Sequence, residues 1–137
     1  MTPKLSSLIL CDGMHANPTT GKHIIVGTFY RIGYHTFPFG MPPFTIYVAL
    51  TNGHGVVHNR IEIVEDDDVT IIAKSNDFII TLKSPLETGE AQINFPAGIP
   101  IRRPGALFLK LYSNGEALEG RRIEVIKTAP HGVDAGK

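Results

Sequence analysis

The sequence predicts an all-β fold, an antiparallel β-sandwich of immunoglobulin-like architecture with about eight or nine strands. The first observation is that apolar residues recur mainly with a period of two, which is the spacing of one face of a strand. The second is that residues favouring turns separate these runs at short intervals. The third is that no window of about twelve residues shows the apolar stripe of a helix.

Three runs in the first half of the chain are predicted to be strands. Residues 8–11 (LILC) form a short, almost wholly apolar run. Residues 22–32 (KHIIVGTFYRI) alternate, but both alternating sets are largely apolar, which predicts a strand with neighbours on both faces. Residues 44–51 (FTIYVALT) place four large apolar side chains on one face, namely Phe44, Ile46, Val48 and Leu50.

Three further runs continue the pattern in the rest of the chain. Residues 59–65 (NRIEIVE), 105–113 (GALFLKLYS) and 120–127 (GRRIEVIK) each alternate between apolar and polar positions. Their apolar sets are expected to face the core, and they comprise Ile61 and Ile63, then Leu107, Leu109 and Leu111, then Ile123 and Val125.

Turn signals fall between the predicted strands. Residues 17–21 (NPTTG) should connect the first two strands, and Asn114-Gly115 is the strongest hairpin signal because both residues tolerate positive φ. The segments 37–44 and 95–105 are rich in Pro and Gly and are predicted to be loops or crossings between sheets. We expect one domain over residues 1–128 and a flexible C-terminal tail over residues 129–137, where the alternation ends.

The composition narrows the class of protein. The chain has 137 residues, 42% hydrophobic and 19% charged, which are ordinary values for one globular domain. The net charge of zero argues against a nucleic-acid partner, since phosphate contacts require an excess of Lys and Arg. No apolar run approaches the roughly 20 residues that span a bilayer, and the single cysteine, Cys11, cannot form an internal disulfide. A cytoplasmic protein without a membrane or nucleic-acid partner is therefore expected.

Four consecutive carboxylates, Glu65 to Asp68, form the most conspicuous polar run. A Ca²⁺ ion requires six to eight oxygen ligands, so Asp66 and Asp68 are candidate ligands. Neighbouring residues of an extended chain point to opposite faces, however, so at most two of the four would converge. The run is favoured as a solvated hairpin turn, in which Asp side chains bond the local backbone.

Histidines provide a second candidate metal site. His15 and His23 flank the turn at residues 17–21 and are expected to face each other across a hairpin, where they would share a metal with a third ligand. His54 and His58 have the spacing of a helical zinc site, but Gly53 and Gly55 place them in a loop and a strand. For His15 and His23 the competing interpretation is a pair of polar positions at a loop end. No cofactor is expected.

The segment 34–44 (YHTFPFGMPPF) concentrates large apolar side chains among Pro and Gly residues. The candidate partner-binding residues are Phe37, Phe39, Met41 and Phe44. Aromatic and Met residues are favoured at protein interfaces. Two interpretations stay open, because the segment either covers one end of the core or contacts a partner protein.

Residues across most of the chain resemble a family of small, uncharacterised bacterial or phage all-β proteins. The resemblance rests on the step Leu10-Cys11-Asp12, the turn ending Gly21-Lys22 and the strand pattern Gly27-x-Phe29. It continues through Phe37-Pro38 and residues 42–48. Members of that family have no assigned function, so the resemblance implies a β-sandwich and supplies no active site. Similar members tend to have a Gly-containing hairpin turn where this chain has Glu65 to Asp68.

Two functions from different classes remain as hypotheses. No nucleophile elbow, phosphate loop or dinucleotide fingerprint occurs, which favours a non-enzymatic binding or assembly module that acts through protein–protein contact, with a homo-oligomer or another protein as partner. The alternative is a β-sandwich that binds a metal or a small ligand through His or Asp side chains at loop ends.

Overall fold

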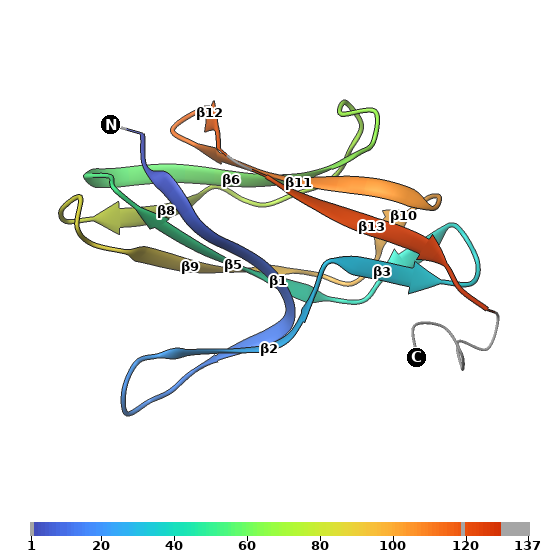
Figure 1. Ribbon diagram of the computed structural model, residues 1–137, viewed down its shortest axis with the longest axis horizontal. Helices are drawn as coiled ribbons and strands as arrows, with labels where there is room; N and C mark the ends of the chain where they lie inside the picture. Colours follow the sequence, from blue (N-terminus) through green and yellow to red (C-terminus); the bar gives the residue numbers. More distant parts are fainter. Residues whose placement is uncertain (1, 119, 130–137) are drawn as a thin grey trace.

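The computed structural model describes all residues except 1, 119 and 130–137, so most of the predicted C-terminal tail lies outside the described residues (Figure 1). Within the described part the fold is all-β, with 13 strands and no helix. This exceeds the predicted eight or nine because short strands form where loops were expected, for example Phe39–Met41 (β4) and Ile99–Ile101 (β10), which pair with each other.

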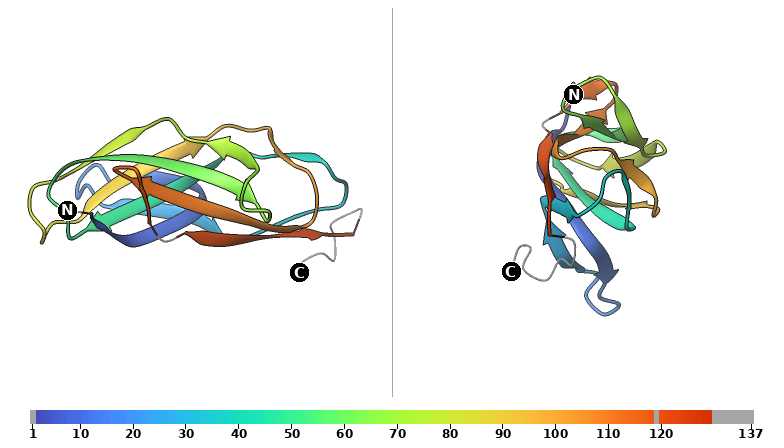
Figure 2. Two further views of the ribbon diagram at one scale, coloured as in Figure 1. Left: turned by 90° about the horizontal axis from the view of Figure 1, so that it is seen from above. Right: turned by 90° about the vertical axis from the view of Figure 1, so that its right-hand side faces the viewer.

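The first sheet has four strands in the order β2-β1-β5-β9. These are His23–Phe29 (β2), Lys4–Ala16 (β1), Phe44–Thr51 (β5) and Gly89–Phe95 (β9), all paired antiparallel. Strand β5 is buried along nearly its whole length, because it is central in this sheet. Figure 2 shows the far end of the β1–β2 hairpin extending beyond the rest of the molecule.

The second sheet has its main path in the order β3-β13-β11-β6-β7. Its members are Arg31–Tyr34 (β3), Arg121–Lys127 (β13), Gly105–Ser113 (β11), Gly55–Glu65 (β6) and Ile71–Lys74 (β7), with Glu116–Ala117 (β12) on β11 and Phe78–Leu82 (β8) on β6. The expectation of an entirely antiparallel fold is wrong at one pairing, since β3 and β13 are parallel. A parallel pair needs a long connection, and here nine other strands lie between β3 and β13 in the sequence.

Side chains from both sheets form one buried cluster. The four apolar residues predicted for one face of β5 are all in it, together with Leu107, Leu109 and Leu111 of β11 and Ile61 and Ile63 of β6. Leu50, Ile61 and Leu109 are fully buried. The period-two pattern therefore identified the core faces of these strands correctly.

The predicted strand over residues 22–32 is divided between the sheets. Strand β2 ends at Phe29, exposed Tyr30 crosses between the sheets, and β3 begins at Arg31. The expectation that β2 has neighbours on both faces is also wrong, because β2 is an edge strand with Ile24 and Val26 about half exposed. An apolar edge strand cannot be distinguished from a buried strand by its residue types alone.

Candidate functional site

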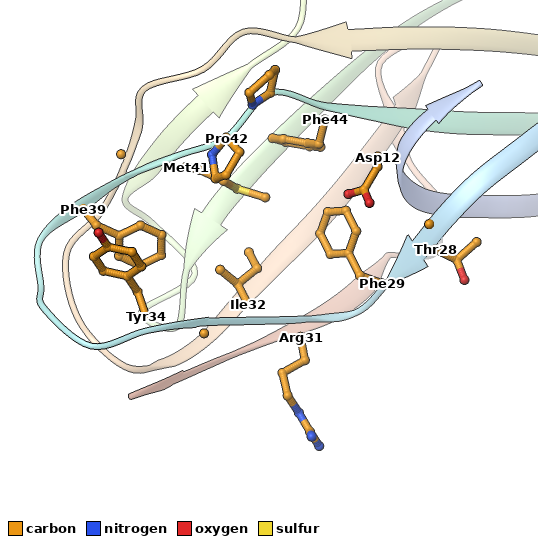
Figure 3. A pocket seen from close by; sticks show the side chains of 14 residues that line it. Asp12, Thr28, Phe29, Arg31, Ile32, Tyr34, Phe39, Met41, Pro42 and Phe44 are labelled. Carbon is orange, nitrogen blue, oxygen red and sulfur yellow. The ribbon is translucent and has the colours of Figure 1, made fainter. Parts of the chain in front are cut away.

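An aromatic cleft of about 460 Å³ lies where the chain crosses from β2 to β3 and returns through β4 to β5. Its lining comes from residues 27–29, 31–34 and 39–44, with Asp12 of β1 at one end. Figure 3 shows Asp12 beside the ring of Phe29 and, at the other end, the stacked rings of Tyr34 and Phe39. Apolar side chains dominate the walls, and Ile32, Met41 and Phe44 lie between the two ends.

Ring contacts hold the cleft walls together. Tyr34 stacks on Phe39 with ring centroids 4.7 Å apart, and Phe37 meets Phe39 edge to face at 5.3 Å. Phe44 stacks on Phe95 at 5.0 Å and meets Phe29 edge to face at 6.2 Å. These arrangements are the favourable ones for aromatic pairs, so the walls are fixed by packing.

The predicted partner-binding residues divide into two groups. Met41 and Phe44 are buried in the core cluster, whereas Phe37 and Phe39 are half-buried and pack against it. The segment therefore covers part of the core, as the first interpretation expects, and Phe39, Met41 and Phe44 also line the cleft. Binding of a partner here stays a prediction.

Asp12 owes its position to Gly27 on the neighbouring strand. Gly27 has φ of +69°, and a Cβ atom added to it would lie 2.3 Å from Oδ2 of Asp12. The carboxylate therefore occupies the space that any other residue at position 27 would fill. Among the residues that the structure describes, the Asp12 carboxylate has no hydrogen-bond donor or cation as partner.

The other charged lining residue, Arg31, is directed away from the cleft (Figure 3). Its Nε donates to Oε1 of Glu124 at 2.9 Å. The positive charge of Arg31 is thus balanced outside the cleft, and the negative charge of Asp12 is the unbalanced one within it.

Cys11, which precedes Asp12 in β1, is fully buried, and its Sγ lies 3.5 Å from the carbonyl oxygen of Thr45. Burial raises the pKa of its thiol.

The acidic run lies in the hairpin between β6 and β7, as predicted. Asp67 accepts from the backbone amides of Val69 and Thr70 and from the Thr70 hydroxyl. The Thr70 hydroxyl and then these amides lower the pKa of Asp67 to about 2. Asp68 has φ of 63° and forms an ion pair with Lys110.

The other two carboxylates of the run contact different cations. Glu65 is 4% exposed and accepts from Nε of Arg102 at 2.8 Å. Asp66 forms an ion pair with Arg103 at 3.0 Å. Asp66 and Asp68, the candidate calcium ligands, are thus each bound to a separate cation on another strand or loop. Glu65 is not a solvated turn residue, because it is buried beneath these arginines.

The candidate histidines lie on opposite faces of the β1–β2 hairpin. The register places His15 opposite Ile24 and His23 opposite Ala16. The expectation that His15 and His23 face each other is therefore wrong by one position, and one position reverses the face. Instead, Nε2 of His23 lies 3.6 Å from Oε1 of Glu90, and its ring packs against Tyr47. In the described part of the chain, no group of three or more His, Cys, Asp or Glu residues could hold a metal ion.

Sequence reasoning missed Asp12, Tyr34 and Ile32 as cleft residues. In the sequence, Asp12 and Gly27 are noted only as part of the family resemblance. Their spacing does not indicate that the Asp12 side chain fills the space beside Gly27 on the neighbouring strand. Three residues of that pattern, Asp12, Gly27 and Phe29, meet at the same cleft.

Fold and site together define an all-β protein with two main sheets, a small β4–β10 sheet, one core and an aromatic cleft beside it. The chain belongs to a family of unknown function, DUF6941, whose model matches residues 6–126. This confirms the resemblance to a family without an assigned function. No match to a curated protein was found. Among the described residues no helix is long and apolar enough to cross a membrane.

One solved structure similar to this chain is the Pseudomonas fluorescens alkylpurine DNA glycosylase AlkC bound to DNA containing an abasic site analog. The identity is 13% and the TM-score 0.40, over 87% of this chain and 30% of that one. The expectation of no nucleic-acid partner is withdrawn, because a DNA-bound protein stands among the structural matches and a net charge of zero does not exclude a local contact. At this TM-score the likeness is no argument for DNA binding either.

Proposed function

We propose that this protein is a non-enzymatic binding module of β-sandwich architecture that acts through protein–protein contact at the aromatic cleft. The observation on which the proposal depends is the cleft itself, an apolar concavity with aromatic walls and one unbalanced carboxylate. Interfaces concentrate aromatic and Met side chains at their buried centres. The acidic run supports a non-catalytic role, because its four carboxylates all hold partners that fix the hairpin and the arginine loop.

A bacterial, cytoplasmic setting accompanies the proposal. The buried thiol of Cys11 fits a reducing compartment, in which protein contacts and not disulfides hold assemblies together.

Selection from a peptide library displayed on phage tests the proposal. The purified chain should enrich a defined group of peptides, and Tyr34→Ser or Phe39→Ser should abolish their capture. Tyr34 is 42% exposed, so its replacement should leave the unfolding midpoint nearly unchanged. The matched control is Ile79→Ser on β8, which is 58% exposed and lies outside the cleft.

Three results would contradict the proposal. The first is that no peptide is enriched. The second is that Ile79→Ser and Tyr34→Ser reduce capture equally, which would indicate general surface stickiness. The third is that Phe39→Ser reduces stability and capture in proportion, which would mean that the segment only covers the core.

A small-molecule ligand is the second candidate. The cleft volume of about 460 Å³ falls within the range of small-molecule sites, and Asp12 would orient a polar group at one end. Native mass spectrometry of protein purified without a tag would show a retained molecule as a defined mass increase. That increase should disappear in Phe39→Ser if the molecule occupies this cleft.

A further inference from the structure

We infer that the occupant of the cleft is an extended peptide segment that adds to the free edge of β3 and places a Lys or Arg side chain against Asp12. This inference rests on the proposed function and specifies its partner. Three features of the described residues support it, namely the exposed strand edge, the unbalanced carboxylate and the aromatic walls.

Among the residues that the structure describes, strand β3 ends the second sheet, and one of its two edges has no strand paired with it. The paired edge faces β13, where the carbonyls of Tyr30 and Tyr34 accept from the amides of Glu124 and Thr128 at 3.0 and 2.9 Å. Backbone groups alternate in direction along a strand, so the peptide groups of Arg31 and Gly33 point away from β13. An extended segment can bond to these groups, which is the mode known as strand addition.

The same strand lines the cleft. Ile32 points into it between the aromatic pair Tyr34–Phe39 and Asp12 (Figure 3). A segment paired with β3 therefore places alternate side chains over the apolar walls. Backbone bonds at the edge would supply affinity, and the walls would select the side chains.

Charge selects the side chain at the Asp12 end. The Asp12 carboxylate has no cationic partner within the described residues, whereas Arg31 is already paired with Glu124. The ring of Phe29 beside Asp12 offers a π face, which attracts the same cations. A guanidinium or ammonium group would bind both the Asp12 carboxylate and the Phe29 ring, whereas the Asp12 carboxylate would repel a carboxylate or phosphate.

The test uses the peptides enriched by the selection above, synthesised with a fluorescent label and titrated by anisotropy. The enriched sequences should share a basic residue flanked by alternating apolar residues. Asp12→Asn should weaken binding about ten- to one-hundredfold, because a hydrogen bond between charged groups is lost. Replacing the basic residue of the peptide with Gln should weaken its binding to the wild-type protein by a similar factor. The same replacement should change the affinity for the Asp12→Asn variant little.

Two controls separate charge and edge pairing from general effects. Asp77→Asn removes an exposed carboxylate outside the cleft and should leave affinity unchanged. N-methylation of alternate peptide amides should abolish binding at one set of positions and spare the other, since only one set can bond to β3.

The outcomes distinguish the inference from the proposed function. Enriched peptides whose binding requires Phe39 but not Asp12, or that contain no basic residue, would overturn this inference. The proposed function as a binding module would still stand. N-methylation without positional effect would overturn strand addition. A DNA oligonucleotide that displaces the peptide would overturn a cationic occupant, because DNA phosphates are anionic. Failure to enrich any peptide would overturn both.

Discussion

Glu65 shows how much a single side chain depends on its fold. In the sequence it begins a run of four acids, but in the structure it is buried and bonded to Arg102, while Arg103 lies 3.6 Å away. The bond from Arg102 lowers the pKa of Glu65, although burial opposes this effect. The pairing therefore contributes stability above the unfolded pKa of about 4.3, and that contribution is lost as the pH falls through the lowered folded value.

Glu65→Gln should destabilise the protein by roughly 1 kcal/mol at neutral pH, since Arg102 is half exposed and water weakens the pair. The variant should also lose less stability than wild type when the pH falls below about 4. Urea unfolding at neutral and acidic pH measures both effects. Asp77→Asn is the control, and an equal acid dependence in wild type and Glu65→Gln would contradict the assignment.

Tyr47 on β5 has a raised pKa, in contrast to the lowered pKa of Glu65. Burial, followed by the hydrogen bond to Glu90, raises the pKa of Tyr47 to about 12. This hydroxyl stays protonated at physiological pH and links β5 to β9, a contact that no residue pattern in the sequence indicates.

At the scale of elements, the close approach of β1 to β2 depends on Gly27. Its positive φ suits glycine, and the Asp12 carboxylate fills the position of a Cβ atom. From this position Asp12 of β1 lines the end of the cleft.

Gly27→Ala should destabilise the protein by about 1 to 3 kcal/mol, through backbone strain and displacement of Asp12. Gly13→Ala is a matched control on the partner strand, because an added Cβ there meets nothing within 4 Å and no positive φ is required. Thermal unfolding of the two variants checks the difference. Equal midpoints would show that the β1–β2 pair tolerates an ordinary residue at position 27.

The hairpins were the most predictable elements. Asn114 and Gly115 have φ of 48° and 83°, as the Asn-Gly signal predicted, and Gly21 ends the first turn with φ of 72°. In that turn the Asn17 side chain accepts from the amides of Thr19 and Thr20. Such turns depend on contacts between near neighbours, so local sequence is sufficient to predict them.

At the scale of the whole molecule, one core joins the two sheets. Leu109 of β11 is fully buried in the cluster that also contains Ile46 of the other sheet. The sheets are therefore expected to unfold together as one cooperative unit.

Leu109→Ala should destabilise the protein by about 2 to 5 kcal/mol and keep a single unfolding transition. Far-ultraviolet circular dichroism and tyrosine fluorescence should report the same midpoint, since Tyr47 and Tyr112 belong to different sheets. Val56→Ala, at a half-exposed position of β6, is the control and should change stability by less than about 0.5 kcal/mol. Separate transitions for the two signals would contradict a shared core.

The sequence by itself determined the all-β class, the core faces of β5, β6, β11 and β13, and the main turns, because these depend on periodicity and on backbone preferences of neighbouring residues. Only the tertiary structure decided the division of residues 22–32 between two sheets, the parallel pairing of β3 with β13, and the separation of His15 from His23 by one register position. It also decided the cleft, where Asp12 meets Phe29 and the Tyr34–Phe39 pair. Those features arise from contacts between distant segments, and a single residue of register or one strand crossing changes which side chains meet.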